Sequence, residues 1–329
     1  MQPKTNKIVL LSFAFFVFSV NCIAFSNFFD ADRQGYIDTQ RGIDQYNNLR
    51  QRAGLQGNLN INDLPVIRFV QVFVTSVVLI SLFFSNATSL AAMTLYLVWP
   101  YSAFLATKIK QEFILFPLAF ITVRETLRGE LIVSGGIGLV SYLAGENNGI
   151  IIVIFRLLAF GLVRMNLGTA FFLTVAGIST AILADWYFDF VSSLLEPIAK
   201  YAYTRDTVNP EYSIAESAGI LLTTMHLGIN PPTDYWFHLP FSACALILAW
   251  FGYRELDKSE KAVCLQSLMA FTVVFLTFTS MTHAFQNTRY YYFLLPVMFP
   301  RFESRLFIGL LSISVLHTFT AVYIYEWLR

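Results

Sequence analysis

Apolar stretches alternate with short charged breaks along most of the chain. Several of these stretches are long enough to cross a hydrocarbon layer about 30 Å thick, which takes roughly 20 helical residues. The alternation predicts an all-α polytopic membrane protein with about eleven transmembrane helices. The predicted spans are 8–28, 65–84, 88–107, 112–124, 131–145, 149–163, 167–187, 237–253, 262–284, 290–300 and 306–327.

Two polar stretches, residues 29–64 and 188–236, are longer than the connections between the other spans. Neither a repeat nor a linker divides the chain, so we expect a single transmembrane domain over residues 1–329. The first span has the basic start and apolar core of a signal peptide, but no small-residue cleavage site follows. We therefore expect a retained first span, with a cleaved signal peptide as the alternative.

Composition narrows the class of protein. The chain of 329 residues is 56% hydrophobic and 13% charged, its net charge is +1, and no basic run is interleaved with aromatic residues. The lipid bilayer is therefore an expected partner and nucleic acid is not. Cys22, Cys244 and Cys264 lie in apolar stretches without the spacing of a metal site or a disulfide framework, so the sequence predicts no metal and no cofactor.

Basic residues are unevenly distributed between the short ends of the spans. With the N-terminus inside, the short outer connections hold only Lys108, Lys110 and Arg289, which satisfies the positive-inside rule. Both long loops and Arg289 then face outward. The inner ends hold Lys4, Lys7, Arg124, Arg128, Arg164, Arg254, Lys258, Lys261, Arg301 and Arg305.

The first long loop contains two candidate features. Ile43, Tyr46 and Leu49 recur at helical spacing among polar residues, which predicts an amphipathic helix that either rests on lipid headgroups or contacts a substrate. Just before it, Asp30 and Asp32 form a D-x-D pattern. Two carboxylates at that place could bind a divalent cation, and Asp32 is also a candidate base.

The second long loop contains a candidate catalytic histidine. Ser213 and Glu216 have the spacing of a capping box and an apolar run follows, so we expect a helix over about 214–227. His226 lies in its last turn, where the helix dipole favours a positive charge. It has either a structural role or a role in catalysis or phosphate binding.

Four basic residues are candidates for contact with a substrate at the membrane. Lys108 and Lys110 lie at an outer turn and either anchor the span to headgroups or bind phosphate. Arg156 lies near the centre of a span, so we expect it to pair with a carboxylate or a ligand. Arg289 precedes three tyrosines at an outer span end, and its forked guanidinium suits either a lipid-linked diphosphate or a headgroup.

The chain resembles the EpsG-like and Wzy-type bacterial polysaccharide polymerases at three places. These are GYIDTQRGIDQY in the first loop, Lys110-Gln111 at the start of a middle span, and the Arg-x-x-Tyr pattern of Arg289 and Tyr292. Two positions depart from the family. Lys110 stands where an arginine is usual, and Glu146 lies in AGENNG, the region where many relatives have a histidine.

The resemblance implies a glycosyltransferase that polymerises oligosaccharide repeat units carried on undecaprenyl diphosphate. Such an enzyme would lie in the bacterial inner membrane with its active face periplasmic or extracellular, and a chain-length regulator protein is a candidate partner. We expect a GT-C-like arrangement of helices. The expected diphosphate-binding residues are Arg289, Lys110, Lys108 and Arg33, the candidate bases are His226, His283 and Asp32, and the candidates for the substrate cavity are Arg156, Glu146 and Tyr292.

Two other functions remain open on the same residues. A GT-C glycosyltransferase that takes one sugar from a polyprenyl phosphate would use the outer D-x-D with a metal ion. A transporter or flippase for lipid-linked sugars would use Arg156 on a path through the middle of the membrane, although charged residues within the spans are few.

Overall fold

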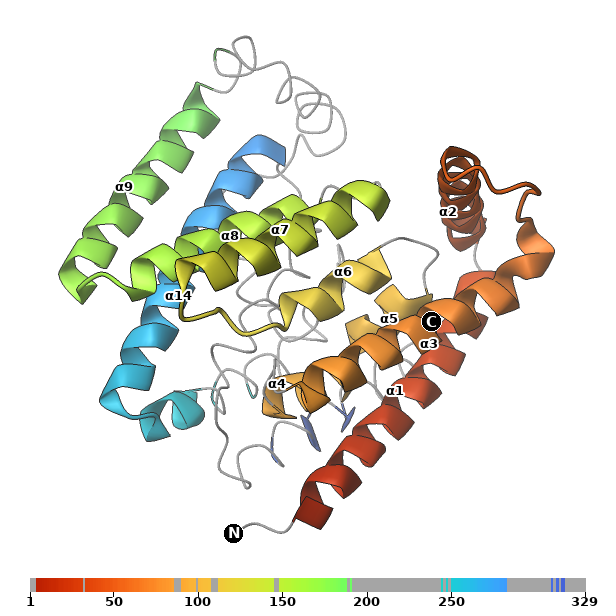
Figure 1. The fold of residues 1–329 in the computed structure, drawn as a ribbon, viewed down its shortest axis with the longest axis horizontal. Helices are drawn as coiled ribbons and strands as arrows, with labels where there is room; N and C mark the ends of the chain where they lie inside the picture. Colours follow the sequence, from red (N-terminus) through yellow and green to blue (C-terminus); the bar gives the residue numbers. More distant parts are fainter. Residues whose placement is uncertain are drawn as a thin grey trace. The chain divides into compact units, whose positions relative to one another are not determined.

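The computed structural model describes about two thirds of the chain, and all regular secondary structure in that part is helical, as predicted (Figure 1). The described residues are 4–31, 33–85, 90–98, 100–107, 112–144, 148–187 and 250–282, with the single positions 190, 244, 247, 309, 312, 313, 315 and 316.

Four helical segments among these residues are long and apolar enough to cross a membrane. They are Ile61–Phe84, Leu127–Ala144, Leu167–Trp186 and Lys258–Thr277. Two shorter apolar helical segments, Ile8–Ile23 and Gly149–Val163, lie within two other predicted spans. The helical membrane class is therefore supported, and the count of eleven spans stays a prediction.

The chain forms two compact units, and helices α7 (Leu127–Ala144) and α8 (Asn148–Val163) contribute to both. The prediction of a single domain is not tested by this division. Unit 1 comprises Met1–Thr122, Gly135–Ile152 and Phe299–Arg329, and unit 2 comprises Val123–Ser134 and Val153–Met298.

Unit 1 contains the N-terminal helices. Helix α1 (Lys4–Ala31) packs against α4 (Leu90–Val98) and α5 (Pro100–Thr107), while α3 (Leu64–Phe84) packs against α5 and α6 (Glu112–Ala119). The remaining elements of the first part are α2 (Arg33–Arg52) and a short 3₁₀ helix, η1 (Ile61–Asp63).

Proline shortens two of the predicted spans in unit 1. The apolar run 88–107 contains two helices rather than one, and Pro100 is the first residue of the second, where its missing N–H is tolerated. Helix α6 contains Pro117 and ends two residues later, where the Phe120 N–H donates to the Pro117 carbonyl at 3.1 Å. Neither α4, α5 nor α6 alone is long enough to cross a bilayer.

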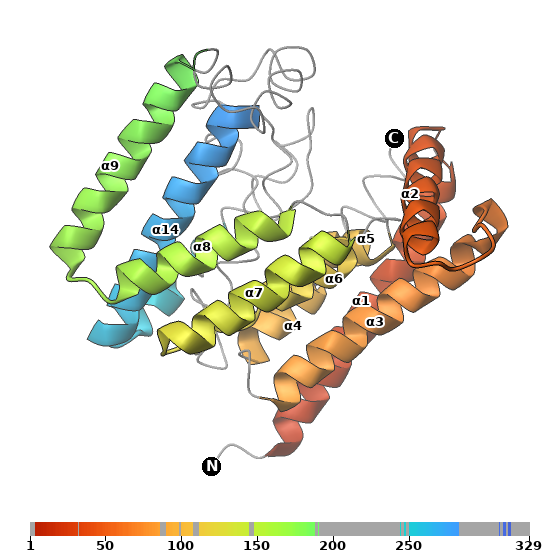
Figure 2. The same ribbon diagram turned by 45° about the horizontal axis from the view of Figure 1, so that its top comes forward.

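Unit 2 contains two long helices, α9 (Leu167–Trp186) and α14 (Lys258–Thr282), which lie side by side in both views (Figures 1 and 2). They approach closely at Gly177, where an added Cβ would lie 2.9 Å from Cγ1 of Val273. Small residues at such contacts let the backbones of membrane helices come together. In the same unit the Gln266 amide of α14 donates a hydrogen bond to the Met165 carbonyl, just before α9, at 2.9 Å.

Helix α3 has its polar side inward and its apolar side outward. Its buried residues are Leu64, Ile67, Arg68, Gln71, Thr75 and Leu79. Most of its exposed side chains are apolar, and Phe69 and Phe84 are 70% and 76% exposed. A helix of a soluble protein shows the opposite pattern. An exposed apolar side is instead the side that a bilayer would cover.

Candidate functional site

Helix α2 in the first long loop has a sharply defined C-terminal end. It begins at Arg33 and ends in a Schellman motif, in which the Gly54 N–H donates to the Gln51 carbonyl and the Leu55 N–H to the Arg50 carbonyl. Gly54 has a φ of 72°, a conformation that glycine adopts without strain. The chain therefore turns back after α2 towards the start of α3.

The apolar side of α2 packs on its own chain. Ile43 is buried with Leu64 and Ile67 of α3, and Tyr46 packs partly buried against this cluster. The sequence predicted the helix and its apolar side correctly. Of the two expected occupants, headgroups or a substrate, neither covers Ile43, because the start of α3 does.

Hydrogen bonds fix α2 to the segment that leads into α3. The side chain of Asn47 donates to the Leu59 carbonyl at 2.9 Å and accepts from the Leu59 N–H at 2.7 Å. The Gln71 amide donates to the Tyr46 hydroxyl at 2.9 Å. Burial raises the pKa of the Tyr46 phenol, and the hydrogen bond with Gln71 offsets part of this rise.

A line of polar side chains continues from this contact along the inward side of α3. Arg68, Gln71 and Thr75 are 7%, 1% and 0% exposed. Their spacing of three and four residues places them on one side of the helix. The Thr75 hydroxyl donates to the Phe113 carbonyl of α6 at 3.2 Å. We call Arg68, Gln71 and Thr75 the polar side of α3.

A second buried arginine lies in unit 2, where Arg156 of α8 forms an ion pair with Glu130 of α7. Arg156 Nε donates to Glu130 Oε1 at 2.7 Å and Nη2 donates to Oε2 at 2.9 Å. Their side chains are 2% and 0% exposed. This bidentate geometry is the strongest form of the arginine–carboxylate contact.

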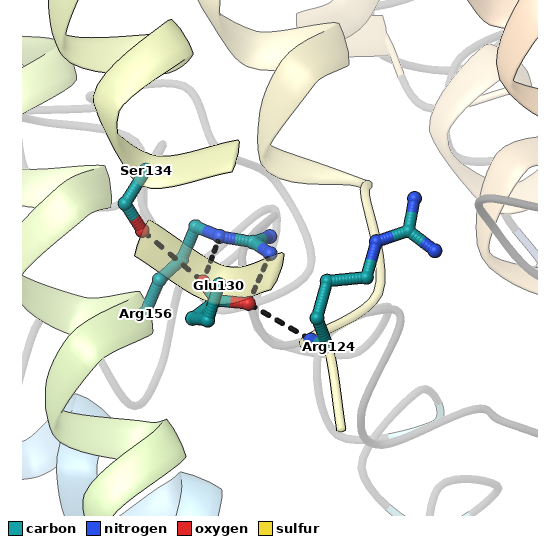
Figure 3. Close-up of polar contacts among 4 residues, drawn as sticks. All are labelled: Arg124, Glu130, Ser134 and Arg156. Atoms are coloured by element: carbon teal, nitrogen blue, oxygen red, sulfur yellow. Dashed lines mark hydrogen bonds and ion pairs between the residues drawn. The ribbon is translucent and has the colours of Figure 1, made fainter. Parts of the chain in front are cut away.

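Two further donors complete the surroundings of the Glu130 carboxylate. The Ser134 hydroxyl donates to Oε1 at 3.1 Å, and the backbone N–H of Arg124 donates to Oε2 at 2.8 Å. Figure 3 shows both contacts and shows the Arg124 side chain extending away from the carboxylate. Glu130 therefore connects α8 with the segment before α7 and with the first turns of α7.

The predicted pairing of Arg156 is confirmed, since its partner is a carboxylate. A role of Arg156 in a substrate cavity stays a prediction. Arg33 is the first residue of α2, and nothing is described of its side chain. The other predicted site residues lie outside the described residues: Asp32, Lys108, Lys110, Glu146, His226, His283, Arg289 and Tyr292.

Two buried charged residues, one in each unit, were not singled out from the sequence. Glu130 directly precedes the predicted span 131–145. Arg68 lies inside the predicted span 65–84, and its spacing to Gln71 and Thr75 is visible in the sequence. A charged residue within an apolar run was the signal in the case of Arg68.

Comparison with known proteins identifies no relative of this chain. No protein-family model matches the chain, and neither a curated protein nor a solved structure matches it significantly. Function must therefore be argued from the residues themselves.

Proposed function

We propose that this chain is a multispan membrane glycosyltransferase that polymerises oligosaccharide units carried on undecaprenyl diphosphate. It would have about eleven spans in a GT-C-like arrangement, and it would act at the outer face of the bacterial inner membrane. The resemblance of three short motifs to the EpsG-like and Wzy-type polymerases motivates this proposal.

The observation that carries the proposal is the docked position of α2. The motif GYIDTQRGIDQY lies within α2, and its last residue, Tyr46, is hydrogen-bonded to Gln71 of the apolar helix α3. The motif is therefore held at the end of a helix long enough to cross a membrane. An element that positions a lipid-linked saccharide needs such a place, because the saccharide projects from the membrane surface while its lipid stays in the bilayer.

The reaction would be a displacement at the anomeric carbon of the donor sugar. A hydroxyl of the acceptor saccharide attacks this carbon, the bond to the diphosphate oxygen breaks, and undecaprenyl diphosphate leaves with the bonding electron pair. A base such as His226, His283 or Asp32 takes the hydroxyl proton. Arg289, Lys110, Lys108 and Arg33 would stabilise the negative charge of the leaving group.

Polymerisation by the purified protein tests the proposal directly. The protein in nanodiscs, given lipid-linked repeat units and an excess of EDTA, should produce polymer without a nucleotide sugar, because cationic side chains can neutralise a diphosphate. Loss of activity that Mg²⁺ or Mn²⁺ restores would favour the metal-dependent GT-C alternative with Asp30 and Asp32. Movement of lipid-linked sugar between leaflets without polymer would favour a flippase.

The outward position of α2 can be tested on intact cells. Asn58 is exposed next to α2 and Ser259 is exposed near the start of α14, at opposite predicted sides of the membrane. In a background without the three native cysteines, Asn58→Cys should react with an impermeant thiol reagent, whereas Ser259→Cys should react only after lysis. The reverse labelling pattern would place the motif inside and refute an outer active face.

A further inference from the structure

One end of unit 2 brings together basic residues from three segments of the chain. These segments are the residues before and at the start of α7, the end of α8, and the residues around the start of α14. The Arg164 guanidinium donates to the Glu125 carbonyl, and Gln266 of α14 donates to the Met165 carbonyl at 2.9 Å. The end of α8 and the starts of α9 and α14 therefore lie at the same end of the unit (Figures 1 and 2). We define the basic end of unit 2 as Arg124, Arg128, Arg164, Arg254, Lys258 and Lys261.

Hydrogen bonds to the backbone hold this end in place without neutralising it. Arg164 also donates to the Phe160 carbonyl at 2.9 Å, and Lys261 donates to the Arg254 carbonyl at 2.9 Å. Neither contact involves a carboxylate. Four further cations are exposed, and their side chains form no ion pair within the described part of the chain: Arg124, Arg128, Arg254 and Lys258.

The buried ion pair fixes the backbone that presents one of these cations. The Arg124 N–H donates to Glu130 Oε2 at 2.8 Å, while the Arg124 side chain extends away from that carboxylate (Figure 3). The next turn is closed by the Thr126 hydroxyl, which accepts from the Gly129 N–H at 3.1 Å. A ligand that binds Arg124 would therefore meet a segment whose backbone is already ordered.

Acidic residues at this end do not cancel its charge. The described carboxylates there are Glu125, Glu255, Asp257 and Glu260, against the six cations. Two of them form a capping box at the start of α14, in which Asp257 accepts from the Glu260 N–H at 2.8 Å and Glu260 accepts from the Asp257 N–H at 3.2 Å. The basic end therefore keeps an excess of positive charge and suits an anionic ligand.

Exposed apolar and aromatic side chains adjoin these charges. Trp250 is 60% exposed and stacks on Tyr253, with 5.9 Å between the ring centroids. Leu127 and Leu167, the first residues of α7 and α9, are 57% and 46% exposed. Arginine and lysine beside exposed tryptophan, tyrosine and aliphatic residues are typical of the boundary between membrane and water. This combination favours a lipid headgroup over a soluble acidic partner.

We propose that the basic end of unit 2 binds the headgroups of anionic phospholipids. The phosphate oxygens would accept hydrogen bonds from the guanidinium and ammonium groups, while the acyl chains lie along the exposed apolar side of α9. The predicted topology places this end on the cytoplasmic side, where anionic lipids attract basic residues next to membrane spans. The inference does not depend on the proposed polymerase activity.

The test is lipid binding by the full-length protein, purified in a neutral detergent and measured by native mass spectrometry. The probe is phosphatidylglycerol, and the reference is phosphatidylcholine with the same acyl chains and no net charge. The wild type should bind phosphatidylglycerol at least about tenfold more tightly. This preference should shrink as ammonium acetate is raised from about 50 to 500 mM, because salt screens exposed charges.

Paired substitutions locate the binding. Arg124→Gln with Arg128→Gln removes two exposed charges of the basic end and should lower the affinity for phosphatidylglycerol about tenfold. Arg41→Gln with Arg52→Gln is the matched control, because it removes two exposed charges from α2 in unit 1 and should keep the wild-type affinity. Arg124→Lys with Arg128→Lys keeps the charge, so it should keep most of the affinity. Thermal unfolding of each variant shows whether the fold is retained.

Several results would overturn the proposal. Equal affinity of the wild type for the two lipids does so, and so does an equal loss of affinity in the α2 control, because net charge alone would then decide. Glycerophosphoglycerol, the same headgroup without acyl chains, should not compete at the concentration of the lipid, and full competition would indicate a site for a soluble anion instead. If the glutamine variant does not fold, a wild-type preference that salt leaves unchanged overturns the proposal.

Discussion

Two arginines are buried in apolar helices of the described part of the chain, and they lie in different units. Arg156 in unit 2 is 2% exposed, and Glu130 binds it through both carboxylate oxygens at 2.7 and 2.9 Å. Arg68 in unit 1 is 7% exposed and shares its side of α3 with the neutral polar side chains of Gln71 and Thr75. The first arginine is held by a carboxylate whose two oxygens each have a further donor.

The bidentate partner of Arg156 favours a structural role for this charge. An arginine matched by a carboxylate of this kind stabilises one arrangement of helices, and a ligand would have to displace a strong contact to reach it. Arg156 is therefore a weak argument for a transport path.

The largest expected effect follows from breaking the ion pair in unit 2. Arg156→Ala or Glu130→Ala leaves a buried charge without its partner, so we expect each to lower the free energy of unfolding by about 3–5 kcal/mol. The measurement is thermal unfolding and the yield of monodisperse protein in detergent. Glu125→Ala, which removes an exposed carboxylate from the segment before α7, should have little effect.

A double substitution decides whether the pair is structural only. Glu130→Leu with Arg156→Met replaces both charges by apolar groups, which is often neutral for stability. If this protein folds and polymerises at a normal rate, Arg156 has no part in substrate binding. Recovery of the fold without polymer would instead support the predicted cavity role of Arg156.

The second prediction concerns the apolar contact in the same unit. Gly177→Leu would insert a side chain between α9 and α14 where a Cβ alone already lies 2.9 Å from Val273, so we expect a loss of about 1–3 kcal/mol. Val273→Ala should relieve part of this loss in the double variant. Gly161→Ala is the control, since an added Cβ there meets nothing within 4 Å. Equal stability of all these variants would show that the close contact of α9 and α14 at Gly177 contributes little to the stability of unit 2.

The sequence predicted the helices better than the partners of their polar residues. Apolar runs predicted α3, α7, α8 and α9 because a bilayer of fixed thickness requires a certain helix length. The sequence predicted that Arg156 pairs with a carboxylate or a ligand, but it did not identify Glu130 as the carboxylate. The two residues are 26 positions apart, and their contact depends on how α7 and α8 are aligned, which apolar periodicity does not determine.

The sides of α2 and α3 that face the rest of the chain were harder to predict from the sequence, for a related reason. An apolar side of α2 fits lipid headgroups or protein equally well, so the pattern of Ile43 and Tyr46 could not show that the start of α3 covers them. In α3 most residues are apolar, and Phe69, Phe73 and Phe84 are exposed, while Arg68 and Gln71 are buried. Hydropathy averages over both sides and therefore does not reveal the polar one.

The third prediction concerns the capping box of η1, which directly precedes α3 in unit 1. Asn60 accepts a hydrogen bond from the Asn62 N–H at 2.8 Å, and Asp63 accepts one from the Asn60 N–H at 2.8 Å. This capping box precedes the turn that carries Arg68. Asn60→Ala should lower the stability by about 1 kcal/mol, while Asn60→Ser should lose less because serine also caps helices. Equal melting temperatures of both variants and the wild type would mean that the capping box of η1 contributes little to stability.

The smallest expected effect is a dependence on alkaline pH at the contact between α2 and α3. The pKa of Tyr46 is raised in the folded protein by burial, while an unfolded tyrosine has a pKa of about 10. Deprotonation above pH 10 therefore favours the unfolded chain, and the stability due to the buried neutral phenol is present below pH 10 and lost as the pH rises towards the folded pKa. At pH 10.5 the loss is below about 1 kcal/mol, because the slope cannot exceed about 1.4 kcal/mol per pH unit.

Tyr46→Phe removes the titrating group and isolates this effect from all other groups in the protein. Its thermal unfolding temperature should fall less steeply than that of the wild type between about pH 9.5 and 11. This is the range in which an ordinary tyrosine ionises. Below pH 9 the variant should be slightly less stable, because the Gln71 amide loses the hydroxyl that accepts its hydrogen bond. Parallel curves for the two proteins would mean that the Tyr46 hydroxyl ionises as readily in the folded state as in the unfolded state. The contact with Gln71 would then be open to water, and the polar side of α3 would be more accessible than its burial indicates.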